Sequence, residues 1–196
     1  MVARQRRRHA MMSPARKAIR RRRRWNDVMR RPWRALALIS GCIMLLLTLV
    51  DAPRPRMVWN SSLSSPVGLY AVGDQQGLRP GDMVVANLPP TVKDLAAGRR
   101  YLPVNVPVVK QVAAAGGDLV CARGRHVSVN GRTLAERLSQ DRHGRPLPSW
   151  FGCRRLARGQ LFLLSAGVRD AFDGRYFGVT ERREVIGRAR HLWPFE

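Results

Sequence analysis

The chain has 196 residues and a formal net charge of +23, a length that suggests one soluble domain with appendages. Its three cysteines and four histidines show no metal-ligand spacing, so we expect neither a metal site nor a cofactor. The motifs G-x-S-x-G, H-E-x-x-H and C-x-x-C are absent, which argues against the common serine hydrolases, zinc peptidases and dithiol oxidoreductases. Any hydrolytic chemistry must therefore use a less usual arrangement.

The N-terminal segment 1–34 holds 14 of the 36 Lys and Arg residues and a single acid, Asp27. Arginine runs can neutralise nucleic-acid phosphates. They can also act as a topogenic signal, because basic residues that flank a membrane span stay in the cytoplasm. The second interpretation is favoured because an apolar segment begins directly after Arg34. We therefore expect a basic cytoplasmic segment and no nucleic-acid partner.

The apolar segment 35–50 reads A-L-A-L-I-S-G-C-I-M-L-L-L-T-L-V and carries no charge. It is shorter than the roughly 20 residues that cross a bilayer, although Trp33 and the arginine stems can extend it at the interface. A cleaved signal peptide is the alternative, but the basic region is long and no A-x-A follows. We predict a retained single-pass anchor at 35–50 and an exported domain at 51–196.

The exported domain reads as β-rich, because short apolar runs alternate with Gly, Pro, Asn and Asp. The expected strands and apolar runs are 69–72, 83–86, 104–115, 119–122, 126–129, 132–134, 160–165 and 184–189. Asn130-Gly131 suits a type I′ hairpin turn. One short helix is expected at 91–97, and 135–158 reads as loop-rich. The fold class predicted is mainly β, an antiparallel sheet or barrel.

Two features could carry chemistry. The first is the serine cluster N-S-S-L-S-S-P-V-G-L-Y at 60–70, just outside the predicted span, where Pro66 and Gly68 brace a plausible nucleophile. The second is Lys110, which strand alternation places on one face with Val108 and Val112. Burial would lower the pKa of Lys110 and make a neutral amine available as a general base. The alternative is a solvated lysine on an edge strand.

Other residues suggest structural roles. In an exported domain Cys121 and Cys153 could form a disulfide, or they could be two buried free thiols. The histidines have no acidic partner at a telling spacing, so we interpret them as surface or structural residues. Asp173 and Arg175 flank a glycine and suit an internal ion pair that holds a turn.

Taken in order, four blocks give the chain its resemblance to a known family. They are the serine cluster at 60–70, R-P-G-D-M-V-V at 79–85, V-V-K-Q-V-A-A-A-G-G-D at 108–118, and D-G-R-Y-F-G at 173–178 continuing to V-I-G-R-A at 185–189. Together with the upstream anchor, they resemble the membrane-bound serine–lysine signal peptidases of the S26 type. The nearest branch is the conjugative-transfer, TraF-type maturation peptidases.

The resemblance implies a role for each matching residue. Ser64 would be the nucleophile, with Ser65 as the alternative register, and Lys110 would be the general base. The Ser62 hydroxyl and the Ser64 N–H would form the oxyanion hole. Asp173 and Arg175 would form a structural ion pair near the site. One position departs from the pattern: family members often carry a lysine-orienting serine where this chain has Ala171.

The resemblance also implies a function. The chain would be an endopeptidase of the bacterial inner membrane, with a periplasmic catalytic domain that cleaves precursor proteins bound as extended strands. A pilin subunit of a conjugative type IV secretion system is the expected substrate, and proteins of the conjugation apparatus are possible partners. The alternatives are a general signal peptidase and a catalytically silent assembly protein of the same fold.

Overall fold

The computed structural model describes residues 32–50 and 55–194, which belong to two separate compact units. The first contains helix α2 (Pro32–Val50), and the second contains every strand found among these described residues. The basic segment predicted at 1–34 lies outside the described residues except for its last three positions. The second unit carries all the residues to which the sequence analysis assigned chemistry.

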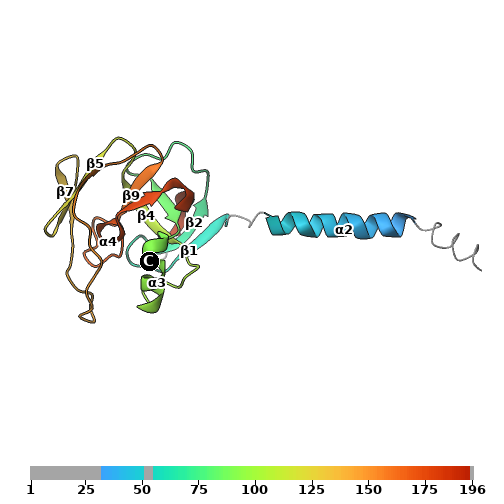
Figure 1. Cartoon of the computed structure of the whole chain (residues 1–196), viewed down its shortest axis with the longest axis horizontal. Helices are drawn as coiled ribbons and strands as arrows, with labels where there is room; N and C mark the ends of the chain where they lie inside the picture. Colours follow the sequence, from blue (N-terminus) through green and yellow to red (C-terminus); the bar gives the residue numbers. More distant parts are fainter. Residues whose placement is uncertain (1–31, 51–54, 195–196) are drawn as a thin grey trace, which may run out of the picture. The chain divides into compact units, whose positions relative to one another are not determined.

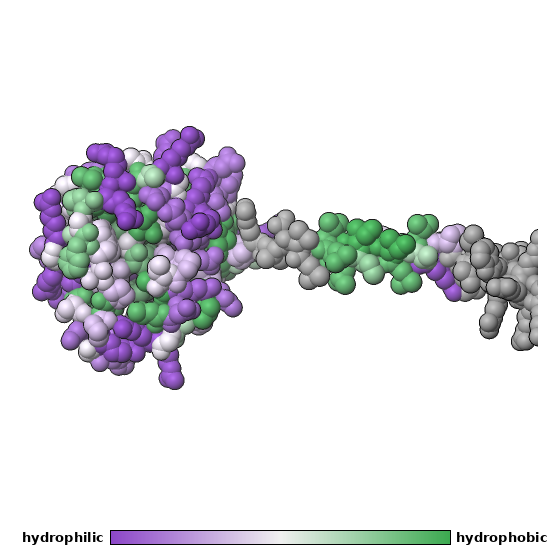
Figure 2. All heavy atoms as spheres, in the orientation of Figure 1, coloured by the Kyte–Doolittle hydropathy of each residue, from purple (hydrophilic) through white to green (hydrophobic). Residues whose placement is uncertain are grey.

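Helix α2 covers the uncharged segment predicted as the anchor. It begins with a proline, which is favourable in the first helical turn, and its described side chains are exposed. Figure 2 shows that apolar residues dominate the visible surface of this helix. Judged by length and hydropathy, no helix among the described residues qualifies as a membrane span.

The second unit is built from eleven strands that all pair antiparallel (Figure 1). The strands are β1 (Met57–Asn60), β2 (Gly68–Val72), β3 (Met83–Ala86), β4 (Val108–Ala114), β5 (Leu119–Arg123), β6 (His126–Val129), β7 (Arg132–Glu136), β8 (Gly152–Arg155), β9 (Gln160–Leu164), β10 (Val179–Glu181) and β11 (Val185–Pro194). Short helices α3 (Pro90–Gly98), α4 (Gly174–Phe177) and η1 (Arg182–Glu184) lie between them. The prediction of a mainly β, antiparallel domain is confirmed.

The strands form two sheets. The larger has the order β1-β2-β11-β3-β4-β9-β10, and the smaller has the order β7-β6-β5-β8. Strand β4 lies inside the larger sheet, where Val84 of β3 stands opposite Lys110 and Leu164 of β9 stands opposite Gln111. The edge-strand alternative for Lys110 is therefore wrong.

Apolar residues fill the space within and between the sheets. One core cluster joins the smaller sheet to β9, and another packs β3, β4 and β9 with β11. Phe162 belongs to the first and Leu163 to the second, so β9 contributes to both. Helix α3 packs through Val92 and Ala96 in a separate cluster, which also includes Leu88 from the segment before the helix. Strand β9, which ends beside Lys110, is therefore packed against apolar residues on both of its faces.

Each predicted strand or apolar run overlaps an observed strand, but β4 begins at Val108 rather than at 104, and β11 continues to Pro194 rather than ending at 189. Strands β1, β8 and β10 were not predicted, and β8 lies within the stretch 135–158 that was expected to be loop-rich. Strand β8 reads G-C-R-R, and all four residues are exposed, so it has no apolar alternation to detect. It exists because it pairs with β5.

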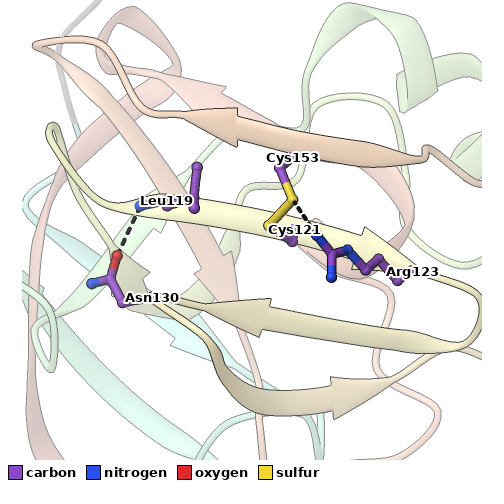
Figure 3. The surroundings of a disulfide bond; sticks show 5 residues. All are labelled: Leu119, Cys121, Arg123, Asn130 and Cys153. Carbon is purple, nitrogen blue, oxygen red and sulfur yellow. Dashed lines mark hydrogen bonds between the residues drawn. A yellow bond between two sulfur atoms is a disulfide. The ribbon is translucent and has the colours of Figure 1, made fainter.

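That pairing carries a disulfide. Cys121 and Cys153 stand directly opposite each other on β5 and β8, and an S–S bond of 2.03 Å joins them. Figure 3 shows the bond beside Arg123, whose guanidinium donates to the sulfur of Cys153. The two cysteines that the sequence offered as a pair are therefore bonded in the structure, and Cys42 on α2 is free.

Replacing both bonded cysteines, as Cys121→Ser with Cys153→Ser, should lower the free energy of unfolding by about 2–4 kcal/mol, because the crosslink restricts the unfolded chain. Urea denaturation followed by tryptophan fluorescence measures the change. Cys42→Ser is the matched control and should leave the unfolding midpoint where it is. A double variant as stable as the wild type under oxidising conditions would contradict a structural disulfide.

Candidate active site

The serine cluster forms the connection between β1 and β2, and Asn60 holds its shape. The Asn60 side chain, 7% exposed, donates to the backbone oxygens of Ser62, Ser65 and Pro66 at 3.0, 3.1 and 2.9 Å. Its amide oxygen accepts from the Ser62 N–H at 3.2 Å. A single buried amide thus satisfies four backbone groups that no strand can pair. This is a physical reason for an asparagine at the head of the block.

Gly68 and Tyr70 fix the other end of this connection. Gly68 has φ +145°, and a Cβ there would lie 2.1 Å from the backbone oxygen of Trp193 and 2.6 Å from the His191 ring. No other residue fits a position with that conformation and so little space. The buried Tyr70 hydroxyl donates to the Pro66 oxygen at 2.7 Å. The segment between is therefore held at both ends.

Lys110 lies against this connection and is 2% exposed. Its Nζ is 2.6 Å from the Ser64 Oγ. Burial lowers the pKa of the Lys110 ammonium from 10.5 to about 8; the charge of Asp173 opposes this shift and that of Arg175 adds to it. A substantial fraction of the amine is therefore neutral near pH 8, as a general base requires.

The neighbouring serines have different surroundings. Ser65 is 9% exposed and points elsewhere, because its hydroxyl donates to the Val109 oxygen at 2.7 Å. The hydrogen bond to Lys110 belongs to Ser64 and not to Ser65. The Ser62 Oγ lies 2.8 Å from the Ser64 Oγ and accepts from the Ser64 N–H at 3.2 Å. The Ser62 hydroxyl and the Ser64 N–H, which were expected to form the oxyanion hole, are thus hydrogen-bonded to each other in this structure.

Ser165 is a site residue that the sequence analysis missed. It directly follows β9 and is 8% exposed, and its Oγ lies 3.0 Å from the Nζ of Lys110. A hydroxyl residue that closes the apolar run L-F-L-L was the available signal. Ala171, where the family often has a lysine-orienting serine, is buried and lines the same cavity as Lys110, but it presents only a methyl group.

Asp173 and Arg175 form the buried ion pair that the sequence predicted. The Arg175 Nε lies 2.8 Å from the Asp173 Oδ1, and the two side chains are 1% and 0% exposed respectively. Their remaining groups hold Ser165: Asp173 Oδ2 accepts from its N–H at 2.8 Å, and Arg175 Nη2 donates to its oxygen at 2.9 Å. Asp173 also caps α4 by accepting from the Arg175 N–H. The pair therefore links α4 to the end of β9.

A cavity of about 430 Å³ opens onto Ser62, Ser64 and Lys110. Much of its remaining lining is apolar, including Leu88, Leu102, Val106, Val108, Val168 and Phe172. A second hollow of about 520 Å³ also reaches Ser64, and Ser165 and Gly167 line it too. Ser64 is therefore accessible from two hollows, as a nucleophile that attacks a continuous peptide would need to be.

Part of the cavity wall comes from the segment around Asp141. Its carboxylate accepts from the Tyr101 hydroxyl, from the Arg145 Nε at 2.7 Å and from the His143 N–H at 2.8 Å. The other two described histidines also have the structural surroundings expected of them: His126 lies 3.7 Å from Glu136, and His191 stacks on Tyr70. None of these histidines hydrogen-bonds to Ser64 or Lys110.

The family model of signal peptidases, peptidase S26, matches residues 29–193, and the chain belongs to this family. A plasmid transfer protein TraF of Escherichia coli is 32% identical over 158 residues, which cover 76% of this chain and 88% of that protein. A second Escherichia coli TraF is 37% identical over 82 residues, covering 40% of this chain and 46% of that protein.

Two signal peptidases also match this chain at lower identity. A signal peptidase I of Leptolyngbya laminosa is 25% identical over 117 residues, covering 59% of this chain and 53% of that protein. The crystal structure of a signal peptidase I from Enterococcus faecalis V583 aligns with a TM-score of 0.34 and 17% identity, covering 59% of this chain and 98% of that one. A score that low establishes no shared fold.

The buried amine should make stability depend on pH. Above about pH 8 the folded Lys110 has lost its proton, whereas the unfolded lysine still binds one. Stability therefore rises with pH in this range, by roughly 1.5 kcal/mol between pH 8 and pH 9.5. Urea denaturation at a series of pH values measures the slope. Lys110→Met should abolish this rise, and an equal slope in both proteins would contradict a lowered pKa of Lys110.

Proposed function

We propose that this member of the S26 signal peptidases is a membrane-anchored serine endopeptidase in which Lys110 activates Ser64. The observation that carries the proposal is the 2.6 Å contact between the Ser64 hydroxyl and the amine of a lysine that is 2% exposed. A serine–lysine pair is a known variant of the catalytic triad. The substrates would be precursors of exported proteins.

The reaction would begin with a proton transfer. The lone pair of neutral Lys110 takes the proton of the Ser64 hydroxyl while the Ser64 Oγ attacks the scissile carbonyl carbon. When the tetrahedral intermediate collapses, the C–N bond breaks and the ammonium of Lys110 returns the proton to the leaving amine. The acyl group remains on Ser64 as an ester. Water completes hydrolysis, or an amine takes its place and forms a new peptide bond.

The oxyanion hole would form when substrate binds. The Ser64 N–H and the Ser62 hydroxyl are bonded to each other in the free enzyme, so neither is yet available to the substrate. Rotation of the Ser62 side chain frees the N–H and lets the hydroxyl donate to the same oxygen. A single donor of this kind contributes about 10²- to 10³-fold to the rate, so the rotation is an essential step of the mechanism.

The relatives suggest the substrate. The chain spans most of a plasmid transfer protein TraF, which supports a role in conjugation. A pilin precursor of a type IV secretion apparatus is the substrate we propose, with the proteins of that apparatus as partners. The apolar lining of the cavity suits an extended peptide with apolar or small side chains. A general signal peptidase is the alternative, supported by the more distant relative of that name.

The anchor belongs to this proposal. We place residues 35–50 in the bacterial inner membrane, with the basic segment in the cytoplasm and the β domain in the periplasm. Support comes from the exposed apolar side chains of α2, such as Leu36, Ile39 and Leu46, and from the basic residues upstream. The Cys121–Cys153 disulfide fits an oxidising compartment. An anchored protease would meet precursors where they emerge from the membrane.

A catalytically silent assembly protein is the second candidate function, and Ala171 is the feature that favours it. The geometry weighs against that function. A protein that needed only the fold could replace Lys110 with an apolar residue and avoid the cost of burying an amine. Here the amine is retained with two hydroxyl partners, Ser64 and Ser165.

Ser64→Ala and Lys110→Ala should each reduce cleavage of a pilin precursor in membranes by at least about 10⁴-fold, because the attacking oxygen or its base is lost. Ser65→Ala tests whether Ser65, rather than Ser64, is the nucleophile, and it should retain activity within about tenfold. Immunoblots of precursor and mature product, at matched enzyme levels, measure the outcome. Normal cleavage by both Ser64→Ala and Lys110→Ala would overturn the proposed function.

Deletion of residues 2–24 should invert the topology or abolish membrane insertion, because it removes most of the charge that holds the N-terminus inside. Protease protection of the β domain in intact spheroplasts reports its side of the membrane. Correct insertion combined with a loss of bound DNA would instead favour the nucleic-acid interpretation of this segment.

A further inference from the structure

The orientation of the Lys110 amine decides whether it can act. A neutral amine has two N–H groups and one lone pair, and only the lone pair can accept the proton of Ser64. A lysine side chain rotates freely about its last bond, so some group must hold the N–H donors away from Ser64. The serine that often does so in the family is Ala171 in this chain.

We propose that Ser165 is the positioning residue for Lys110. Its Oγ lies 3.0 Å from the amine nitrogen and, with Ser64, is one of the two side-chain groups that hydrogen-bond to it in the described part of the chain. By accepting one N–H, Ser165 leaves the lone pair directed at Ser64. This inference rests on the proposed function, because it concerns the same base.

Ser165 is itself rigidly held. Its N–H donates to Asp173 at 2.8 Å and its oxygen accepts from Arg175 at 2.9 Å, so the buried ion pair fixes both sides of the residue. The preceding residue, Leu164, pairs with Gln111 next to Lys110 on β4. Strand pairing and the ion pair therefore set the distance between hydroxyl and amine. A flexible surface serine could not orient a base in this way.

The other polar groups nearby do not replace this contact. Ser62 bonds to Ser64 rather than to the amine. Asp173 and Arg175 act on Lys110 through their charges, with opposite signs. The remaining titratable or charged residues that line the cavity are Tyr101, Asp141, Arg142, Asp170 and Tyr176, and no hydrogen bond joins any of these five to the amine. The Ser165 hydroxyl is therefore the group that orients Lys110.

The test is the pH profile of kcat/KM for Ser165→Ala, with the full-length protein in detergent and a synthetic peptide that spans the precursor cut site. We expect the plateau at alkaline pH to fall by about 10- to 100-fold, because a misdirected amine loses much of the benefit of general-base catalysis. The acidic limb should move to lower pH, because the lost hydroxyl stabilised the ammonium by accepting its hydrogen bond.

Two further variants guard the interpretation. Ser165→Cys keeps nearly the same side-chain shape but offers only a weak hydrogen-bond acceptor. It should therefore lower the alkaline plateau of kcat/KM as Ser165→Ala does, without leaving a cavity beside Lys110. Thr180→Val is the matched control: it removes a buried hydroxyl from β10, the neighbour of β9, that has no hydrogen-bond partner among the described residues. It should leave the profile unchanged.

The results separate this inference from the function on which it rests. A Ser165→Ala plateau within twofold of wild type, or an acidic limb that moves up toward the pKa of an ordinary lysine, overturns the positioning role. The upward shift would mean that the substitution merely admits water around Lys110. If Ser64→Ala and Lys110→Ala still cleave the peptide, the proposed function itself fails, whatever the Ser165 variants show.

Discussion

The burial of one amine is the constraint on which the rest of the domain depends. Lys110 lies inside the larger sheet at 2% exposure, where an ammonium is poorly solvated and its pKa falls to about 8. Such a group can remain buried only if hydroxyls and charges are placed around it. Ser64 and Ser165 provide the hydroxyls, and the Asp173–Arg175 pair provides the balanced charge.

These partners come from segments that are distant in sequence, and each is fixed by a separate device. Asn60 and Gly68 shape the connection that carries Ser64. The pairing of β4 with β9, together with the buried ion pair, places Ser165. The first, third and fourth of the sequence blocks, together with the end of β9, therefore supply or hold the groups that surround one amine.

Much of this arrangement could be predicted from the sequence. Alternation in β4 indicated that Lys110 was buried, and turn residues marked most strands. The predicted nucleophile and base are in contact in the structure. Ser165 escaped prediction because its role depends on where β9 ends relative to β4, and no local pattern encodes that register. Strand β8 escaped for a related reason, since only pairing with β5 makes its exposed residues a strand.

The central claim, that Lys110 activates Ser64, is tested most directly by the rate at which a peptide ester acylates the purified protein, with the labelled residue identified by mass spectrometry. The account predicts a label on Ser64, a rate that reaches half its maximum near pH 8, and no label in Lys110→Met. A label on Ser65, or an unchanged rate in Lys110→Met, would contradict it.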